Sequence, residues 1–217
     1  MNLGKYLPKD HVRGTLAVST GLLLTASFPA FAHHAMGGMT PQTFDQGLLS
    51  GLAHPVIGLD HFAFLVVAML LTAAMKGSAR YIVPLAFVGA TIGGTALHLG
   101  AADIPMSETL VALSVVIGGV LVLTRHYPGA FALGALFAVA GILHGYAYGE
   151  SIVGAEATPL LAYLIGFAAI QYALIIGGVL GLQKLAERSE TARSMAAHIG
   201  STAALLTGGL FLALSFA

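Results

Sequence analysis

The chain lacks cysteine altogether and carries few charges. The absence of cysteine from its 217 residues excludes disulfide bonds, thiolate metal sites and thiol nucleophiles. Charged residues make up 8% of the chain, whereas a soluble domain carries roughly a quarter. Nine Lys and Arg balance nine Asp and Glu, so the basic surface needed to bind nucleic acid is missing. Because 57% of the residues are hydrophobic, the composition predicts an integral membrane protein in a lipid bilayer.

Common catalytic signatures are also missing. The chain has no GxxxxGK[ST] loop, so we expect no nucleotide as a partner. It has neither HExxH nor GxSxG, so we do not expect an enzyme. What it does contain is nine His and seven Met, which supply nitrogen and soft sulfur donors for transition metals.

The first 32 residues have the pattern of a cleavable secretory signal peptide. Three basic residues precede a short apolar stretch, and the small-residue sequence AFA ends at Ala32. The apolar stretch is too short to cross a bilayer comfortably, which favours cleavage over a helix that stays attached. We therefore expect a signal peptide at 1–32, a periplasmic segment at 33–54 and a transmembrane domain at 55–217.

The transmembrane domain is predicted to be a bundle of six helices. A spanning helix needs roughly 20 largely apolar residues. Lipid allows only backbones whose hydrogen bonds are satisfied internally, so the fold class is all-α and polytopic. The six stretches that fit are 55–75, 81–100, 107–124, 129–146, 158–182 and 197–216.

The charges of the connecting loops predict the orientation. Lys and Arg lie in the loops after the first, third and fifth spans, and the alternate loops carry only Asp and Glu. Positive charge favours the cytoplasmic side, so the first span should begin outside the cytoplasm. Together with the signal peptide, this predicts a multi-pass protein of the bacterial inner membrane with both mature ends in the periplasm.

Ionisable residues inside the spans are the candidate functional residues. His54, Asp60, His61, His144 and Glu150 should all reach the periplasmic half of the bundle. Intramembrane ionisable residues usually mark a pathway or a site, and imidazole with carboxylate suits a transition metal. The structural alternative is a buried Asp60–His61 hydrogen bond that only joins helices.

Two further groups of His are weaker candidates. His98 reaches the same half of the bundle, although a lone His near a helix end is more typical of an interfacial residue. His33 and His34 begin the mature chain if the signal peptide is removed. With Met36 and Met39 beside them, they predict a metal-collecting tail, although His and Met in such a tail can also occur by chance.

The spacing of His54 and His61 makes a sharper prediction. On a continuous helix, residues seven apart share a face but lie about 10 Å apart along the axis. Two such side chains cannot bind one ion unless the helix breaks, and Pro55 and Gly58 are plausible positions for a break. An intact helix would instead give two successive binding sites along the path of an ion.

Two motifs resemble a known family. The sequence HPVIGLDH, residues 54–61, fits the HPxxGxDH signature of the HupE/UreJ family of bacterial membrane proteins. The sequence LHGYAYGE, residues 143–150, is similar to that family's second signature, in which a His is expected where Tyr148 stands. The resemblance covers essentially the whole mature chain.

The resemblance implies a secondary permease for a divalent transition metal. It implies nickel or cobalt as the substrate and an association with hydrogenase or urease assembly, so metalloenzyme maturation proteins are expected partners. His54, Asp60, His61, His144 and Glu150 would line the metal pathway. Tyr is a poor nickel ligand near neutral pH, so Tyr148 leaves the coordination number and the metal open.

Other functions fit the same ligands. Three His, an Asp and a bound water also describe an intramembrane zinc hydrolase. A third alternative is an accessory or sensor protein that binds metal without moving it across the membrane. Copper and zinc accept the same donors as nickel and cobalt, so the residues alone do not choose the metal.

Overall fold

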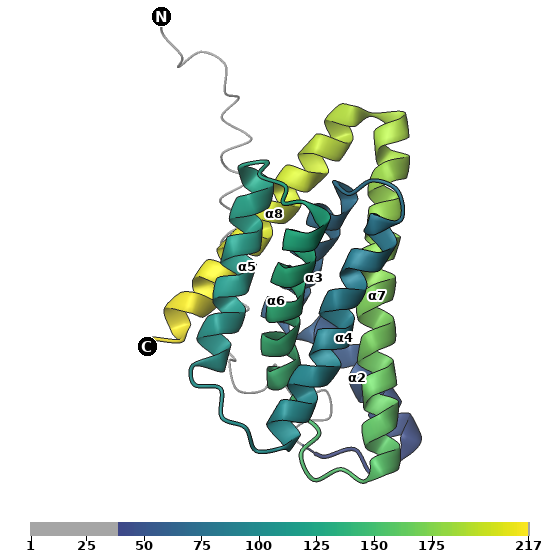
Figure 1. Ribbon diagram of the computed structural model, residues 1–217, viewed down its shortest axis with the longest axis vertical. Helices are drawn as coiled ribbons and strands as arrows, with labels where there is room; N and C mark the ends of the chain where they lie inside the picture. The colour runs from purple at the N-terminus through teal and green to yellow at the C-terminus, as the bar shows by residue number, and fades with distance from the viewer. Residues whose placement is uncertain (1–38, 217) are drawn as a thin grey trace, which may run out of the picture.

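The computed structural model describes residues 39–216, which form an all-α bundle (Figure 1). The predicted fold class is therefore confirmed, whereas the predicted signal peptide, His33 and His34 lie outside the described residues. The helices of this part of the chain are α2 Phe44–Ile57, α3 Leu59–Ala73, α4 Ala79–Leu99, α5 Ser107–Leu123, α6 Ala130–Glu150, α7 Ala157–Arg188 and α8 Glu190–Leu214.

Most of these helices can cross a membrane. Four of them, α4, α6, α7 and α8, are long and apolar enough, and the bent pair of α2 and α3 adds a fifth if it counts as one span. The apolar helix α5 has 17 residues, fewer than the roughly 20 that cross a bilayer upright. The described residues therefore form a multi-pass membrane protein with four or five candidate spans, and the count of six stays a prediction.

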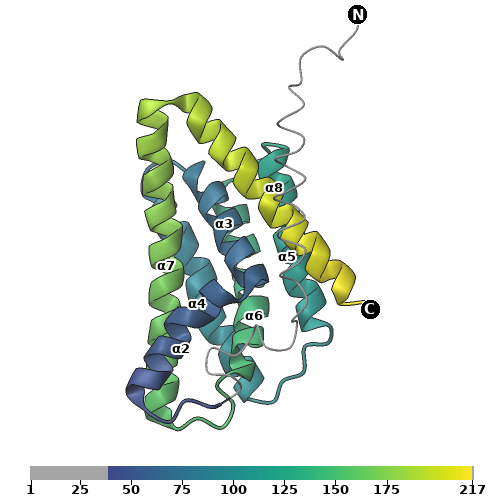
Figure 2. The ribbon, with the colours of Figure 1, turned by 180° about the vertical axis from the view of Figure 1, so that it is seen from behind.

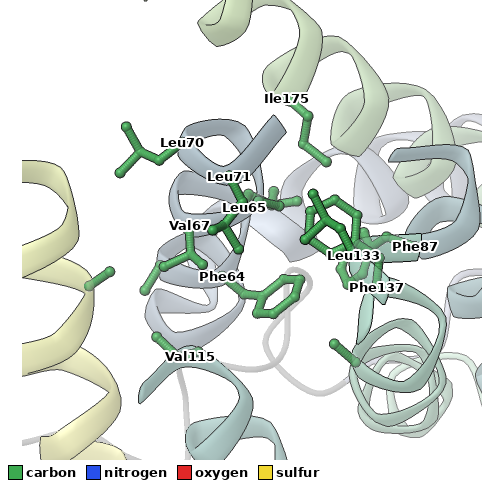
Figure 3. Close-up of a cluster of buried hydrophobic side chains, with 14 of the residues drawn as sticks. Phe64, Leu65, Val67, Leu70, Leu71, Phe87, Val115, Leu133, Phe137 and Ile175 are labelled. Carbon is green, nitrogen blue, oxygen red and sulfur yellow. The ribbon is translucent and has the colours of Figure 1, made fainter. Parts of the chain in front are cut away.

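The core of the bundle is built around α3. Figures 1 and 2 show this helix in the middle of the bundle, and it contacts α5, α7 and α8. Its side chains Phe64, Val67 and Leu71 are completely buried. Phe64 meets Phe87 of α4 and Phe137 of α6, with ring centroids 4.9 and 6.2 Å away (Figure 3). A helix that is apolar on every side is typical of such a central position.

Close helix pairs surround α3, and glycine makes one of them possible. Contacts run along α4 and α6, along α2 and α7, and along α5 and α8. In the second pair Gly51 of α2 lies against the backbone of Tyr163 of α7, where an added Cβ would collide with the Tyr163 carbonyl oxygen. Small residues allow this approach in membranes. It brings His54, one turn after Gly51, next to Tyr163.

The antiparallel course of the helices separates the loops by charge. Loops 74–78 and 124–129 lie at one end of the bundle with the α7–α8 turn, and loops 100–106 and 151–156 lie at the other (Figure 1). The first end therefore carries the basic loop residues and the second the acidic ones. This is the alternation on which the predicted orientation rests, and the orientation itself stays a prediction.

The first predicted span is broken at Gly58. There α2 and α3 meet at an angle of 75°, and Gly58 caps both helices. Pro55 lies in the last turn of α2, where it cannot donate a backbone hydrogen bond. A Cβ at Gly58 would lie 2.7 Å from Cδ2 of His61, so only glycine leaves room for that ring. The break thus falls within the stretch that the sequence marked as a plausible one.

The first helix also starts earlier than the predicted span at 55–75. It begins at Phe44, because Thr43 caps it with a side-chain oxygen that accepts a hydrogen bond from the backbone N–H of Gln46, 3.3 Å away. The side chain of Gln46 in turn accepts a bond of 2.8 Å from the backbone N–H of Gln42. The end of the predicted periplasmic segment is therefore helical and packs against α7.

Candidate metal site

Three His side chains from three helices meet in the interior of the bundle. His54 comes from the end of α2, His61 from the first turn of α3 and His144 from α6, and each is at most 1% exposed. The ring centroids lie 5.7 Å apart for His54 and His61, and 4.9 Å apart for His61 and His144. The bend at Gly58 is what brings His54 and His61 together, since a straight helix would separate them by about 10 Å.

The rings of His61 and His144 contact each other directly. Their Nδ1 atoms are 2.7 Å apart, which is a hydrogen bond that holds one proton. The other nitrogen of His144, Nε2, lies 3.0 Å from Oγ of Ser114 on α5. Ser114 also donates a 2.6 Å hydrogen bond to the carbonyl oxygen of Val111 one turn earlier.

His54 has a comparable hydrogen-bond partner on α7. Its Nδ1 lies 3.1 Å from the hydroxyl oxygen of Tyr163. The same hydroxyl donates a 2.9 Å hydrogen bond to the carbonyl oxygen of Tyr148. Tyr163 is completely buried, so this connection between α2, α6 and α7 is shielded from water.

Tyr148 fills the space beside both His rings of the HPxxGxDH motif. Its ring centroid lies 4.9 Å from that of His54 and 4.6 Å from that of His61. The side chain is completely buried, and its hydroxyl has no hydrogen-bond partner among residues 39–216. A bulky phenol therefore stands where the resemblance leads one to expect an imidazole.

Asp60 lies beside the His cluster, next to His61. Its Oδ1 accepts a 2.8 Å hydrogen bond from the backbone N–H of His61, and the side chain is 5% exposed. It borders a small cavity of about 50 Å³, large enough for one or two water molecules. The other His and Glu residues that line this cavity are His61, His98, Glu108 and Glu150.

Comparison with known proteins decides the family. A model of the family described as HupE / UreJ protein matches residues 21–211. The chain belongs to the HupE/UreJ family. It is 31% identical to protein HupE of Rhizobium leguminosarum bv. viciae over 194 residues, which are 89% of this chain and 96% of that one. No solved structure matches. The family that the two motifs indicated is thus confirmed.

In the structure of this HupE/UreJ protein the candidate ligands form two groups that share His61. His61 lies with His54 and His144, and it also lines the cavity that is bordered by Asp60, His98 and Glu150. Within residues 39–216, no three His, Asp or Glu side chains are arranged so that they could hold a metal ion as they stand. Nδ1 of His61 and Nδ1 of His144, 2.7 Å apart, leave no room for an ion between them. The ligand set stays a prediction.

Two contributors to the site were not expected from the sequence. Ser114 and Tyr163 touch the His side chains, yet neither lies in a motif of the HupE/UreJ family quoted above. Ser114 could have been suspected, although only weakly, because it is a polar residue in the middle of an apolar span. Tyr163 gave no comparable signal, because tyrosine is common near helix ends in membranes.

Proposed function

We propose that this HupE/UreJ protein is a secondary permease that moves a divalent transition-metal ion, nickel or cobalt, from the periplasm to the cytoplasm. The observation that carries the proposal is the meeting of His54 and His61 at a helix break inside the membrane domain. Metal–nitrogen bonds are about 2 Å long, so two imidazoles on one ion have ring centroids roughly 5–6 Å apart. The separation of 5.7 Å agrees with this.

The broken helix supports transport rather than a closed structural site. Discontinuous helices commonly form the substrate sites of secondary transporters, since the break exposes backbone and helix ends to the ion. Asp60 lies in the first turn of α3, directly beside the break. In the proposed site, Asp60 supplies an oxygen ligand or holds the backbone of His61 in place, and water completes the coordination.

The proposed path begins on the side of the acidic loops. The cavity lined by Asp60, His98 and Glu150 would take the ion from the periplasm, after His33 and His34 have collected it. Beyond the His cluster lie the rings of Phe64 and Phe87, with centroids 4.6 and 5.7 Å from that of His144. Transport therefore requires these rings to move. A metal gradient or capture by cytoplasmic maturation proteins would drive the ion inward.

Uptake of radioactive nickel or cobalt by cells tests the proposal. We expect His61→Ala to abolish uptake, because it removes a buried ligand of the motif. His126→Ala is the matched control, because His126 is exposed in a loop. Unchanged uptake in the His61→Ala cells would contradict the permease. Flux into proteoliposomes separates transport from an accessory or sensor role, in which the purified protein binds metal without moving it.

A further inference from the structure

We propose that Tyr163 and Ser114 are positioning residues that fix the tautomers of His54 and His61, so that both rings offer Nε2 to the metal ion. The inference rests on the proposed function for its consequence, but the tautomers themselves are a property of the metal-free protein. Neither residue touches the ion in this scheme. Each acts through a His side chain, directly for His54 and through His144 for His61.

The hydroxyl of Tyr163 determines the tautomer of His54. A phenol has one hydrogen to donate, and the carbonyl oxygen of Tyr148 can only accept. The 2.9 Å contact between these two oxygens therefore uses the Tyr163 hydrogen. The 3.1 Å contact with His54 must then run in the opposite direction, from Nδ1–H of His54 to the Tyr163 oxygen. In neutral His54 the lone pair is consequently at Nε2.

The same reasoning applies to His61 in two steps. Ser114 uses its only hydrogen on the carbonyl oxygen of Val111, 2.6 Å away, so its oxygen accepts from Nε2–H of His144. Neutral His144 then has its lone pair at Nδ1, which accepts the 2.7 Å hydrogen bond from Nδ1–H of His61. In neutral His61 the lone pair is therefore also at Nε2.

The two chains of hydrogen bonds have the same design. Each begins at Nδ1–H of a His in the HPxxGxDH motif and ends on a backbone carbonyl of another helix, Tyr148 on α6 or Val111 on α5. A metal-ligating His almost always donates its second N–H in this way, which fixes the ring and increases its basicity. Both nitrogens of His144 are engaged in the chain, so His144 orients His61 instead of binding the ion.

The first test measures the tautomers without any metal. The full chain carrying ¹⁵N-labelled histidine is studied by NMR in lipid nanodiscs at about pH 8, where an ordinary His is neutral. Signals are assigned from their loss in His54→Asn, His61→Asn and His144→Asn. We expect Nδ1–H in His54 and His61, and Nε2–H in His144. Nε2–H in His54 or His61 would overturn the proposal, whether or not the protein transports metal.

The second test removes each hydroxyl and measures nickel binding. We expect Tyr163→Phe to weaken binding by about 10–100-fold, the usual effect of losing an outer partner of a ligand. Ser114→Ala should also weaken binding, although by less, because Ser114 acts on His61 through His144. Ser114→Thr keeps a hydroxyl and should restore both affinity and the His144 tautomer. Tyr172→Phe and Ser201→Ala are the matched controls, because these hydroxyls donate their hydrogen bonds to backbone carbonyls and not to a His side chain.

The outcomes of the two tests are separable. If Tyr163→Phe and Ser114→Ala bind nickel as tightly as the two controls, the positioning roles are wrong. If the tautomers and affinities follow the prediction while His61→Ala cells still take up metal, the positioning roles stand and the permease function fails.

Discussion

The ring of Phe64 packs against the ring of His144, with the two centroids 4.6 Å apart. The His cluster therefore rests directly on the aromatic core, in which Phe64 stacks on Phe87 at 4.9 Å. Both Phe64 and Phe87 are completely buried, and the ring of Phe87 also lies near His144, with the centroids 5.7 Å apart. The stability of the core and the geometry of the site are consequently linked through one side chain.

Truncating this side chain should destabilise the protein strongly. We expect Phe64→Ala to lower the free energy of unfolding by about 3–5 kcal/mol, because it leaves a cavity among buried rings. Phe131→Ala is the matched control, since Phe131 is 92% exposed on α6 and should change stability by about 0.5 kcal/mol or less. Thermal unfolding in detergent measures both. Equal losses in the two variants would contradict the proposed role of Phe64.

Adding one methyl group at the helix break should disrupt the site. Gly58→Ala places a Cβ 2.7 Å from Cδ2 of His61, so the ring must move away. We expect nickel affinity to fall by about tenfold or more, as for a displaced ligand. Gly89→Ala is the control, because nothing lies within 4 Å of its added Cβ. Isothermal titration of nickel into both proteins checks the prediction, and equal affinities would refute it.

Two tyrosines next to the site should respond differently to loss of the hydroxyl. The Tyr148 hydroxyl is buried with no hydrogen-bond partner among residues 39–216, so Tyr148→Phe should be neutral or stabilising. Tyr163→Phe leaves the Tyr148 carbonyl without its donor and should cost about 1–3 kcal/mol. Thermal unfolding of the two variants side by side tests this. A larger loss for Tyr148→Phe would mean that its hydroxyl has a function in the site.

The negative charge of Asp60 can be removed while its hydrogen bond to the backbone of His61 is kept. In Asp60→Asn the amide oxygen can still accept from the backbone N–H of His61, so the fold should be retained. The loss of an oxygen ligand that neutralises the charge of the ion should reduce cobalt uptake by about 10–100-fold. Asp103→Asn, in an exposed loop, is the control. Normal uptake by Asp60→Asn cells would show that the carboxylate of Asp60 is not needed in the metal pathway.

Much of this molecule could be predicted from local patterns in the sequence. The low charge and long apolar stretches predicted the all-α membrane class, and HPVIGLDH with LHGYAYGE indicated the family. The sequence also predicted where the first span breaks. Pro55 and Gly58 marked the stretch as a plausible break, and the bend lies at Gly58, because both residues affect the helix at their own positions. These features depend on residues that are close together in the chain.

The remaining features depend on contacts between distant segments. The Ser114 and Tyr163 contacts involve residues 30 and 109 positions away in the chain, and each hydroxyl also bonds to a backbone carbonyl, which any residue provides. No residue type marks such an acceptor. The early start of α2 is different, since Thr43 and Gln46 have the spacing of a helix cap and could have been recognised.

The layer formed by Phe64, Phe87 and Phe137 has a consequence for the cell that contains this protein. Phenylalanine rings offer no group that can carry a proton, and a tightly packed apolar constriction excludes a continuous thread of water. In the conformation described here the layer is closed. If the proposed permease function is correct, a layer that stays closed between transport cycles would block the passage of protons and hydrated ions, and the membrane would keep its voltage.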